Sequence, residues 1–262
     1  MGFFERLANR SRDANTLLCV GLDPIFERHA EGDLVDYNRS IIEATAPYAA
    51  CFKPNIAFYE QFGLSGLRAL QATLESVPPE IPVIGDIKRG DIGSTAEAYA
   101  RAAFDFWSFG AVTLSGYFGR DAVDPFLEYD DRGVYVLCRT SNPSAAEFQG
   151  KDLDGGGKVF ESMAIQATSW SPRVGLVVGA TAPRELARVR ELAPSAPLLV
   201  PGLGAQGGTA AEVVAAAGSA AGKILATASR SIYYAGEGPA FAEAAGYAAR
   251  KLRDELREAV NQ

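Results

Sequence analysis

Short apolar runs recur along the chain, and each ends in polar or glycine residues. There are eight of these runs, and their continuous apolar character is typical of buried parallel strands. Between them lie segments with helical spacing of apolar residues, for example 34–48, 96–109 and 183–192. The predicted strands span residues 16–23, 50–55, 82–88, 111–117, 133–141, 174–181, 197–204 and 223–230.

This alternation predicts the fold class. Eight strands that alternate with helices in a chain of 262 residues make an α/β protein, and the count favours a (β/α)8 TIM barrel. An open doubly wound sheet is the competing architecture. Because composition does not shift along the chain, we expect residues 1–262 to form a single barrel domain. The glycine-rich stretch 142–158 predicts a loop.

Composition limits the possible partners and compartments. The net charge of -7 and the lack of a basic run argue against a nucleic-acid partner. Cys19, Cys51 and Cys138 lie far apart in apolar segments, which predicts buried thiols and neither disulfides nor zinc. No apolar run reaches the roughly 18 residues that a membrane span requires, and the first residues do not resemble a signal peptide. We therefore expect no membrane partner and a cytoplasmic location.

Polar residues cluster where the predicted strands end. In a TIM barrel the active site forms at the carboxyl ends of the strands. Each residue alone has an ordinary explanation, as Asp23 before Pro24 suits a turn. Their common placement nevertheless predicts one functional site, and the residues concerned are Asp23, Lys53, Asp86, Lys88, Ser141, Gln206 and Arg230.

The stretch "GDIKRGDIGST", residues 85–95, carries the strongest chemical signal. Strand alternation places Asp86 and Lys88 on the same side, with Val83 and Ile87 on the other. Packing does not explain charged residues in a buried strand. A buried ion pair gives only about the same stability as apolar side chains of similar volume. With Asp86 and Asp91 flanking it, Lys88 should stay protonated, which suits a general acid.

Helix capping bears on the role of Asp91. Ser94 and Glu97 have the spacing of a capping box, which predicts a helix that starts near Thr95. Asp91 would then lie before the cap and would not be needed to cap that helix.

Two glycine-rich segments predict a phosphate site. Residues 200–209, "VPGLGAQGGT", and 226–234, "ATASRSIYY", follow the seventh and eighth predicted strands, where barrels commonly bind phosphate. Gln206 and Arg230 add directed donors. The only histidine, His29, stands in a polar segment that predicts a surface position, so we expect no histidine-based metal site and no metal.

Together these segments resemble a known family, the orotidine 5'-phosphate decarboxylases. "DIKRGDIGST" is similar to the family's D-x-K-x-x-D-I-x-x-T signature, and "GLDP", "FKPN", "TSNP", "VGAT", "PGLGAQGG" and "SRSIYYA" resemble its other anchors. The matches run from about residue 17 to 234 and look most like the bacterial subgroup with chains of this length.

The resemblance implies an activity and a set of roles. Orotidine 5'-monophosphate would be decarboxylated to uridine 5'-monophosphate, the last step of de novo pyrimidine nucleotide synthesis, without a cofactor. Lys88 would protonate C6 of the pyrimidine, and Asp86 would sit against the departing carboxylate. Asp23 and Lys53 would hold ribose hydroxyls and join the charge array.

The resemblance also implies a homodimer and further contacts to the substrate. Asp91 and Thr95 would reach the substrate of the neighbouring subunit. Ser141 would contact the pyrimidine edge with Pro201 beside the base. Gln206 would link the base to the phosphate, which Arg230 and the backbone of Ser229 would bind.

Two alternatives remain from the sequence. One is a magnesium-dependent sugar-phosphate decarboxylase or synthase of the same barrel group. The other is a non-catalytic barrel that binds a phosphorylated metabolite. Thr95, "TSNP" and Gln206 favour a nucleotide over a sugar phosphate, and the intact charge array favours catalysis over binding alone.

Overall fold

The eight predicted strands are present in the computed structural model, which describes residues 1–29, 34–204 and 207–261. They form one parallel sheet in the order β2-β1-β8-β7-β6-β5-β4-β3. The strands are β1 (Leu18–Leu22), β2 (Cys51–Pro54), β3 (Ile84–Arg89), β4 (Ala111–Leu114), β5 (Gly133–Arg139), β6 (Val174–Val178), β7 (Leu198–Pro201) and β8 (Ile224–Ala228).

The two ends of this sheet meet and close it. Phe52 and Asn55 of the β2 segment form parallel bridges with Val83 and Asp86 of the β3 segment. The backbone N–H of Phe52 donates to the carbonyl oxygen of Pro82 at 3.1 Å. Closure confirms the predicted (β/α)8 barrel, and the open doubly wound sheet is wrong.

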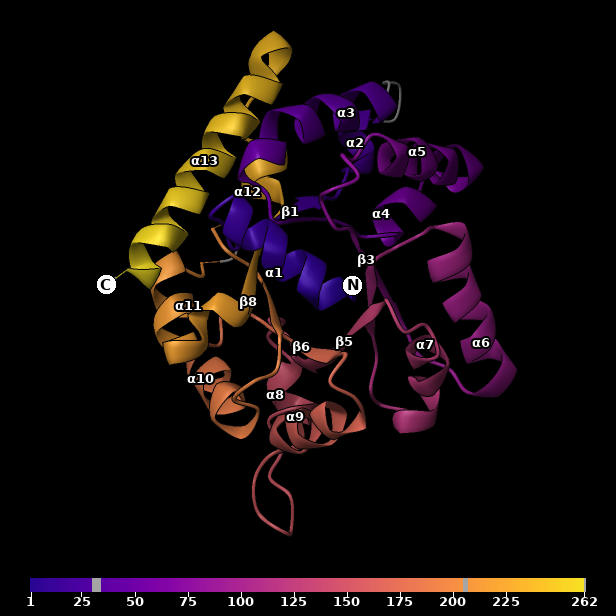
Figure 1. The fold of residues 1–262 in the computed structure, drawn as a ribbon, viewed down its shortest axis with the longest axis vertical. Helices are drawn as coiled ribbons and strands as arrows, with labels where there is room; N and C mark the ends of the chain where they lie inside the picture. The colour runs from indigo at the N-terminus through magenta and orange to yellow at the C-terminus, as the bar shows by residue number, and fades with distance from the viewer. Residues whose placement is uncertain (30–33, 205–206, 262) are drawn as a thin grey trace.

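Helices surround the barrel (Figure 1). Helix α10 coincides with the predicted segment 183–192, whereas the predicted loop 142–158 contains the short helix α8. The helices are α1 (Phe3–Asp13), α2 (Phe26–His29), α3 (Leu34–Thr45), α4 (Ala57–Glu60), α5 (Gly63–Glu75), α6 (Gly93–Arg101), α7 (Asp124–Leu127), α8 (Ala145–Phe148), α9 (Val159–Trp170), α10 (Pro183–Leu192), α11 (Ala210–Ala217), α12 (Arg230–Tyr233) and α13 (Phe241–Val260).

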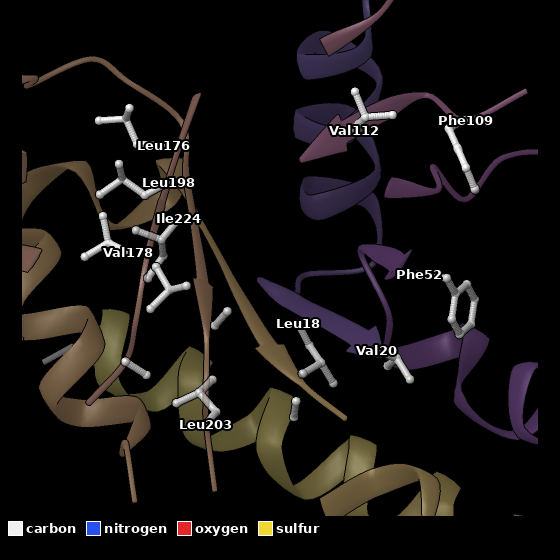
Figure 2. Close-up of a cluster of buried hydrophobic side chains, with 14 of the residues drawn as sticks. Leu18, Val20, Phe52, Phe109, Val112, Leu176, Val178, Leu198, Leu203 and Ile224 are labelled. Atoms are coloured by element: carbon white, nitrogen blue, oxygen red, sulfur yellow. The ribbon is translucent and has the colours of Figure 1, made fainter. Parts of the chain in front are cut away.

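The main hydrophobic core lies between the strands and the helices. Alternate strand residues such as Val20, Phe52 and Val112 are fully buried there, and Figure 2 shows them with Leu176 and Leu198. Because successive residues of a strand point to opposite faces, the intervening residues point into the barrel.

Helix α1 closes one end of the barrel interior. Phe3 and Leu7 of this helix pack with Cys19, Cys51 and Tyr135 in a second buried cluster. In Figure 1 the helix lies across the centre of the ring of helices. The strands' carboxyl ends at the opposite end are therefore the place for a site.

The predictions for the cysteines and for His29 have different outcomes. Cys19, Cys51 and Cys138 are buried and free, as predicted. His29 is also buried, so the predicted surface position is wrong. Its Nε2 lies 2.9 Å from the hydroxyl of Tyr234, and its ring packs edge-on against Tyr37. Within the described ranges, no helix has the length and apolar character needed to cross a membrane.

Candidate active site

Three charged side chains meet where β2 and β3 end. Lys53 Nζ lies 2.9 Å from Asp86 Oδ2, and Lys88 Nζ lies 2.5 Å from Asp86 Oδ1. The side chains of Lys53 and Asp86 are only 5% and 10% exposed, whereas that of Lys88 is 47% exposed. Asp86 therefore connects a buried cation to one that can reach a ligand.

The backbone of β3 departs from a regular strand at Lys88. Its φ is +46°, in the left-handed region that residues other than glycine rarely adopt. The pairing with β4 shifts between Gly85, which opposes Val112, and Arg89, which opposes Leu114. The extra residues form a bulge, and bulges commonly redirect a side chain beside an active site.

Burial and charge act in opposite directions on the pKa values of the cluster. Burial tends to raise the pKa of Asp86, but the positive charges of Lys53 and Lys88 outweigh it and hold the pKa well below its usual range. Burial tends to lower the pKa of Lys53, but the charges of Asp86 and Asp23 outweigh it and raise the pKa. Asp86 is thus an anion and Lys53 a cation near neutral pH.

Asp23 extends the cluster from β1. It is 9% exposed, and its Oδ1 accepts the backbone N–H of Asn55 at 3.2 Å. The bond fixes the carboxylate of Asp23 beside the end of β2.

A cavity of about 520 Å³ opens over these residues. This volume suits a small-molecule ligand. Among the residues that line it are eight of the predicted site residues: Asp23, Lys53, Asp86, Lys88, Ser141, Pro201, Ser229 and Arg230.

Ser229 and Arg230 follow β8 on the far side of this cavity. Gly21 on β1 makes room for Ser229, because a Cβ at Gly21 would lie 1.9 Å from Ser229 Oγ. Arg230 is exposed, and no carboxylate of the described residues lies within ion-pair distance of it. Its guanidinium is therefore available to an anionic ligand.

Two predicted residues of the described ranges are not brought into the cavity of this single chain. Asp91 and Thr95 are not among the residues that line it. Asp91 is partly exposed and Thr95 exposed, both near the start of α6. Gln206 lies outside the described residues.

The predicted capping box is wrong. Helix α6 begins at Gly93, and its N-cap is Ile92, which makes no side-chain capping bond. Gly93 adopts a φ of +54°, so the chain turns into the helix before Ser94. Asp91 does lie before the N-cap, as predicted, and its Oδ1 accepts the backbone N–H of Ile92.

The structure adds cavity residues that the sequence analysis did not name. Thr113 on β4 and Thr227 on β8 are buried, and both line the cavity with Thr140. Thr113 is the one polar residue in β4. A polar residue inside an otherwise apolar strand was the sequence signal that could have identified it as a site residue.

The arrangement provides a cation held on a carboxylate, a ring of polar groups and an exposed guanidinium around one cavity. Such a site can bind an anionic ligand at one end and move a proton at the other. No group of three or more histidine, cysteine or acidic residues in the described part of the chain could hold a metal ion.

The family model and the related proteins that match this chain carry the same family name. The family model described as "Orotidine 5'-phosphate decarboxylase / HUMPS family" matches residues 16–245. A protein from Thermomicrobium roseum named orotidine 5'-phosphate decarboxylase is 47% identical, with 98% of this chain and 95% of the relative covered. A protein of the same name from Herpetosiphon aurantiacus is 46% identical, with 93% of each chain covered.

Solved structures are similar over the same extent. The OMP decarboxylase of Leishmania donovani has a TM-score of 0.88 and 37% identity, with both chains covered completely. The UMP synthase of Leishmania donovani has a TM-score of 0.88 and 41% identity, covering 98% of this chain and 57% of that longer chain.

Proposed function

The chain belongs to the orotidine 5'-phosphate decarboxylase / HUMPS family, and on this premise we propose that it is a carboxy-lyase that converts orotidine 5'-monophosphate to uridine 5'-monophosphate in pyrimidine synthesis. The contact of Lys88 with Asp86 inside the cavity carries the proposal. It places a proton donor and an anion side by side, where a carboxylate must leave and a proton must arrive.

The proposed step is balanced within the site. The bond between C6 and the carboxylate carbon breaks, carbon dioxide leaves, and the electron pair stays on C6. Lys88 then gives a proton from Nζ to C6, and its amine recovers a proton from solvent, which its 47% exposed side chain can reach. Asp86 faces the departing carboxylate and holds the ammonium of Lys88 in place.

The reaction needs stabilisation of negative charge on a carbon. Charges that are already in place beside the reacting atom provide such stabilisation without reorganising during the reaction. Lys88 supplies the charge, and Lys53 balances Asp86. The proposed mechanism therefore requires no cofactor and no metal.

The remaining predicted residues receive roles in binding. Asp23 and Lys53 hold the ribose hydroxyls, Ser141 contacts the base with Pro201 beside it, and Arg230 binds the phosphate with the backbone of Ser229. These roles are supported by their common position around the cavity. Gln206 keeps its predicted role as the link between base and phosphate.

The complete site includes a second copy of the chain. We assign Asp91 and Thr95 to the substrate of the partner subunit in a homodimer. Their place outside the cavity of their own chain supports this assignment. That residues 1–262 fold as one domain and that the enzyme is cytoplasmic stay predictions.

An absorbance assay tests the activity directly. Purified protein is incubated with orotidine 5'-monophosphate in the presence of a strong metal chelator, and loss of the substrate is followed. Conversion to uridine 5'-monophosphate is the expected result. If the folded protein leaves the nucleotide unchanged and acts on a sugar phosphate once magnesium is restored, the proposal is wrong.

A further inference from the structure

Thr113 contacts two members of the charge cluster with one hydroxyl. The backbone N–H of Lys88 lies 3.1 Å from Thr113 Oγ1, and this oxygen lies 2.8 Å from Asp86 Oδ1. Thr113 is 1% exposed and lies on β4, so it is held by the sheet. None of the roles proposed above uses it.

The chemistry of the groups fixes the direction of both hydrogen bonds. A backbone N–H can only donate, so the oxygen of Thr113 must accept from Lys88. The single hydroxyl proton is then free to be donated to Asp86, which accepts as a carboxylate. One side chain therefore links the backbone of Lys88 to the carboxylate of Asp86.

The link lies at the bulge in β3. The pairing with β4 is interrupted between Gly85 and Arg89, so the part-buried backbone N–H of Lys88 needs an acceptor other than the strand ladder. Thr113 supplies that acceptor. The left-handed backbone of Lys88, with a φ of +46°, is the conformation from which its side chain reaches Asp86.

The carboxylate of Asp86 is held from three directions. Lys53 donates to Oδ2, while Lys88 and Thr113 both donate to Oδ1. Lys88 is the member that must release a proton, and its side chain is much more exposed than that of Lys53. Thr113 keeps Oδ1 in place when the contact with Lys88 changes.

We propose that Thr113 is a positioning residue for decarboxylation, which sets the distance between the anion of Asp86 and the ammonium of Lys88. Its hydroxyl is taken up by the backbone of Lys88 and the carboxylate of Asp86, so we assign it a role through these two groups and not on the substrate. This inference rests on the function proposed above, because it concerns the same two side chains.

The test compares Thr113→Val with Thr113→Ser. Valine keeps the shape and removes the hydroxyl, so kcat for orotidine 5'-monophosphate should fall by about 10- to 100-fold, as expected for loss of a hydrogen bond to a charged group. KM and the affinity for uridine 5'-monophosphate, measured by calorimetry, should change by less than about threefold, because ground-state binding is not affected. Serine keeps the hydroxyl and should restore kcat to within about fivefold of the wild type.

Thr45→Val is the matched control. Thr45 is also buried, and its hydroxyl donates to the carbonyl oxygen of Ile41 within α3. The change therefore removes the same group from an equally buried place outside the cavity. It should lower thermal stability and leave kcat at the wild-type value.

The outcomes separate this inference from the proposed function. If the wild type does not decarboxylate the nucleotide, the proposed function is wrong and the inference fails with it. If the wild type is active and Thr113→Val retains its kcat, only the inference is overturned. Equal losses in kcat and product affinity, or a serine variant as slow as the valine variant, would also overturn it.

A second pair of variants tests the inference if Thr113→Val does not fold. If Thr113→Val gives no folded protein, Thr113→Ser is compared with Thr113→Ala, which differ by the hydroxyl alone. The alanine variant should then be slower by at least about tenfold at similar KM. Equal rates would overturn the inference.

Discussion

Lys53 and Asp86 form a buried ion pair across the seam at which the barrel closes. Lys53 Nζ lies 2.9 Å from Asp86 Oδ2, and their strands β2 and β3 stand at the two ends of the sheet order. Bridges on either side of the pair, at Phe52 and Asn55, join the same strands. The charge cluster is therefore assembled at the seam where β2 and β3 meet.

The ion pair predicts how stability depends on pH. The pKa of Asp86 is lower in the folded state than its ordinary value of 3.8. Asp86 therefore contributes to the free energy of unfolding above pH 3.8, and this contribution is lost as the pH falls below that value. The pKa of Lys53 is higher in the folded state than its ordinary value of 10.5. Lys53 therefore contributes to the free energy of unfolding below pH 10.5, and this contribution is lost as the pH rises above that value. The stabilisation should therefore be constant between these values.

Asp86→Asn measures this contribution. The amide leaves the buried ammonium of Lys53 without its hydrogen-bonded carboxylate, with Asp23 as the remaining nearby anion, and should lower the free energy of unfolding by about 3–5 kcal/mol at neutral pH. In urea unfolding, the difference from the wild type should shrink as the pH falls below 3.8, because the unfolded wild type then binds a proton at Asp86 while the folded state, with its lowered pKa, does not. A difference that grows on acidification would contradict this assignment.

Lys88→Ala should separate catalysis from binding. Loss of the general acid should lower kcat by about 10²- to 10⁴-fold, while the affinity for uridine 5'-monophosphate stays nearly unchanged. Absorbance kinetics and calorimetry measure the two quantities. Lys251→Ala on the exposed face of α13 is the control and should behave as the wild type. Equal losses of catalysis and binding would show that the role of Lys88 is wrong.

Arg230→Ala should weaken binding of the phosphate group. Loss of a charge-assisted hydrogen bond should raise the Kd for uridine 5'-monophosphate by about 10- to 100-fold and leave the weaker binding of uridine almost unchanged. Calorimetry with both ligands tests this, with Arg250→Ala on α13 as the control. A similar loss for both ligands would count against the phosphate assignment.

Gly21→Ala should destabilise the barrel beneath the phosphate end of the cavity. The new Cβ would lie 1.9 Å from Ser229 Oγ and 2.7 Å from Ser229 Cβ, so the strand or the loop must shift. We expect a loss of about 1–3 kcal/mol in urea unfolding. Gly222→Ala, where no atom lies within 4 Å of the new Cβ, is the control.

A double variant tests whether the clash is the cause. Ser229→Gly combined with Gly21→Ala removes the atoms that the new methyl group meets and should recover part of the lost stability. Equal destabilisation in the presence and absence of the Ser229 side chain would mean that Gly21 is required for another reason.

The strands were predictable because each is a short apolar run with its own local pattern. The side chains of Asp86 and Lys88 meet, as expected, but they do so through the left-handed backbone of Lys88 at the bulge and not through regular strand alternation. The helix start at α6 was not predictable from Ser94 and Glu97, because Gly93 turns the chain into the helix earlier. His29 was misplaced for a different reason: the tyrosines that cover it, Tyr37 of α3 and Tyr234 just after α12, come from segments that its local sequence does not reveal.

The sequence alone determined the order of strands and helices, the polar residues at the strand ends and the motifs that resemble a family. These properties are local, because they depend on the period of apolar residues and on neighbouring residue types. Only the tertiary structure decided that Lys53 meets Asp86 and that Thr113 reaches both Asp86 and Lys88. Those contacts depend on barrel closure and on the bulge that shifts the register of β3, and both result from pairing between segments far apart in the chain.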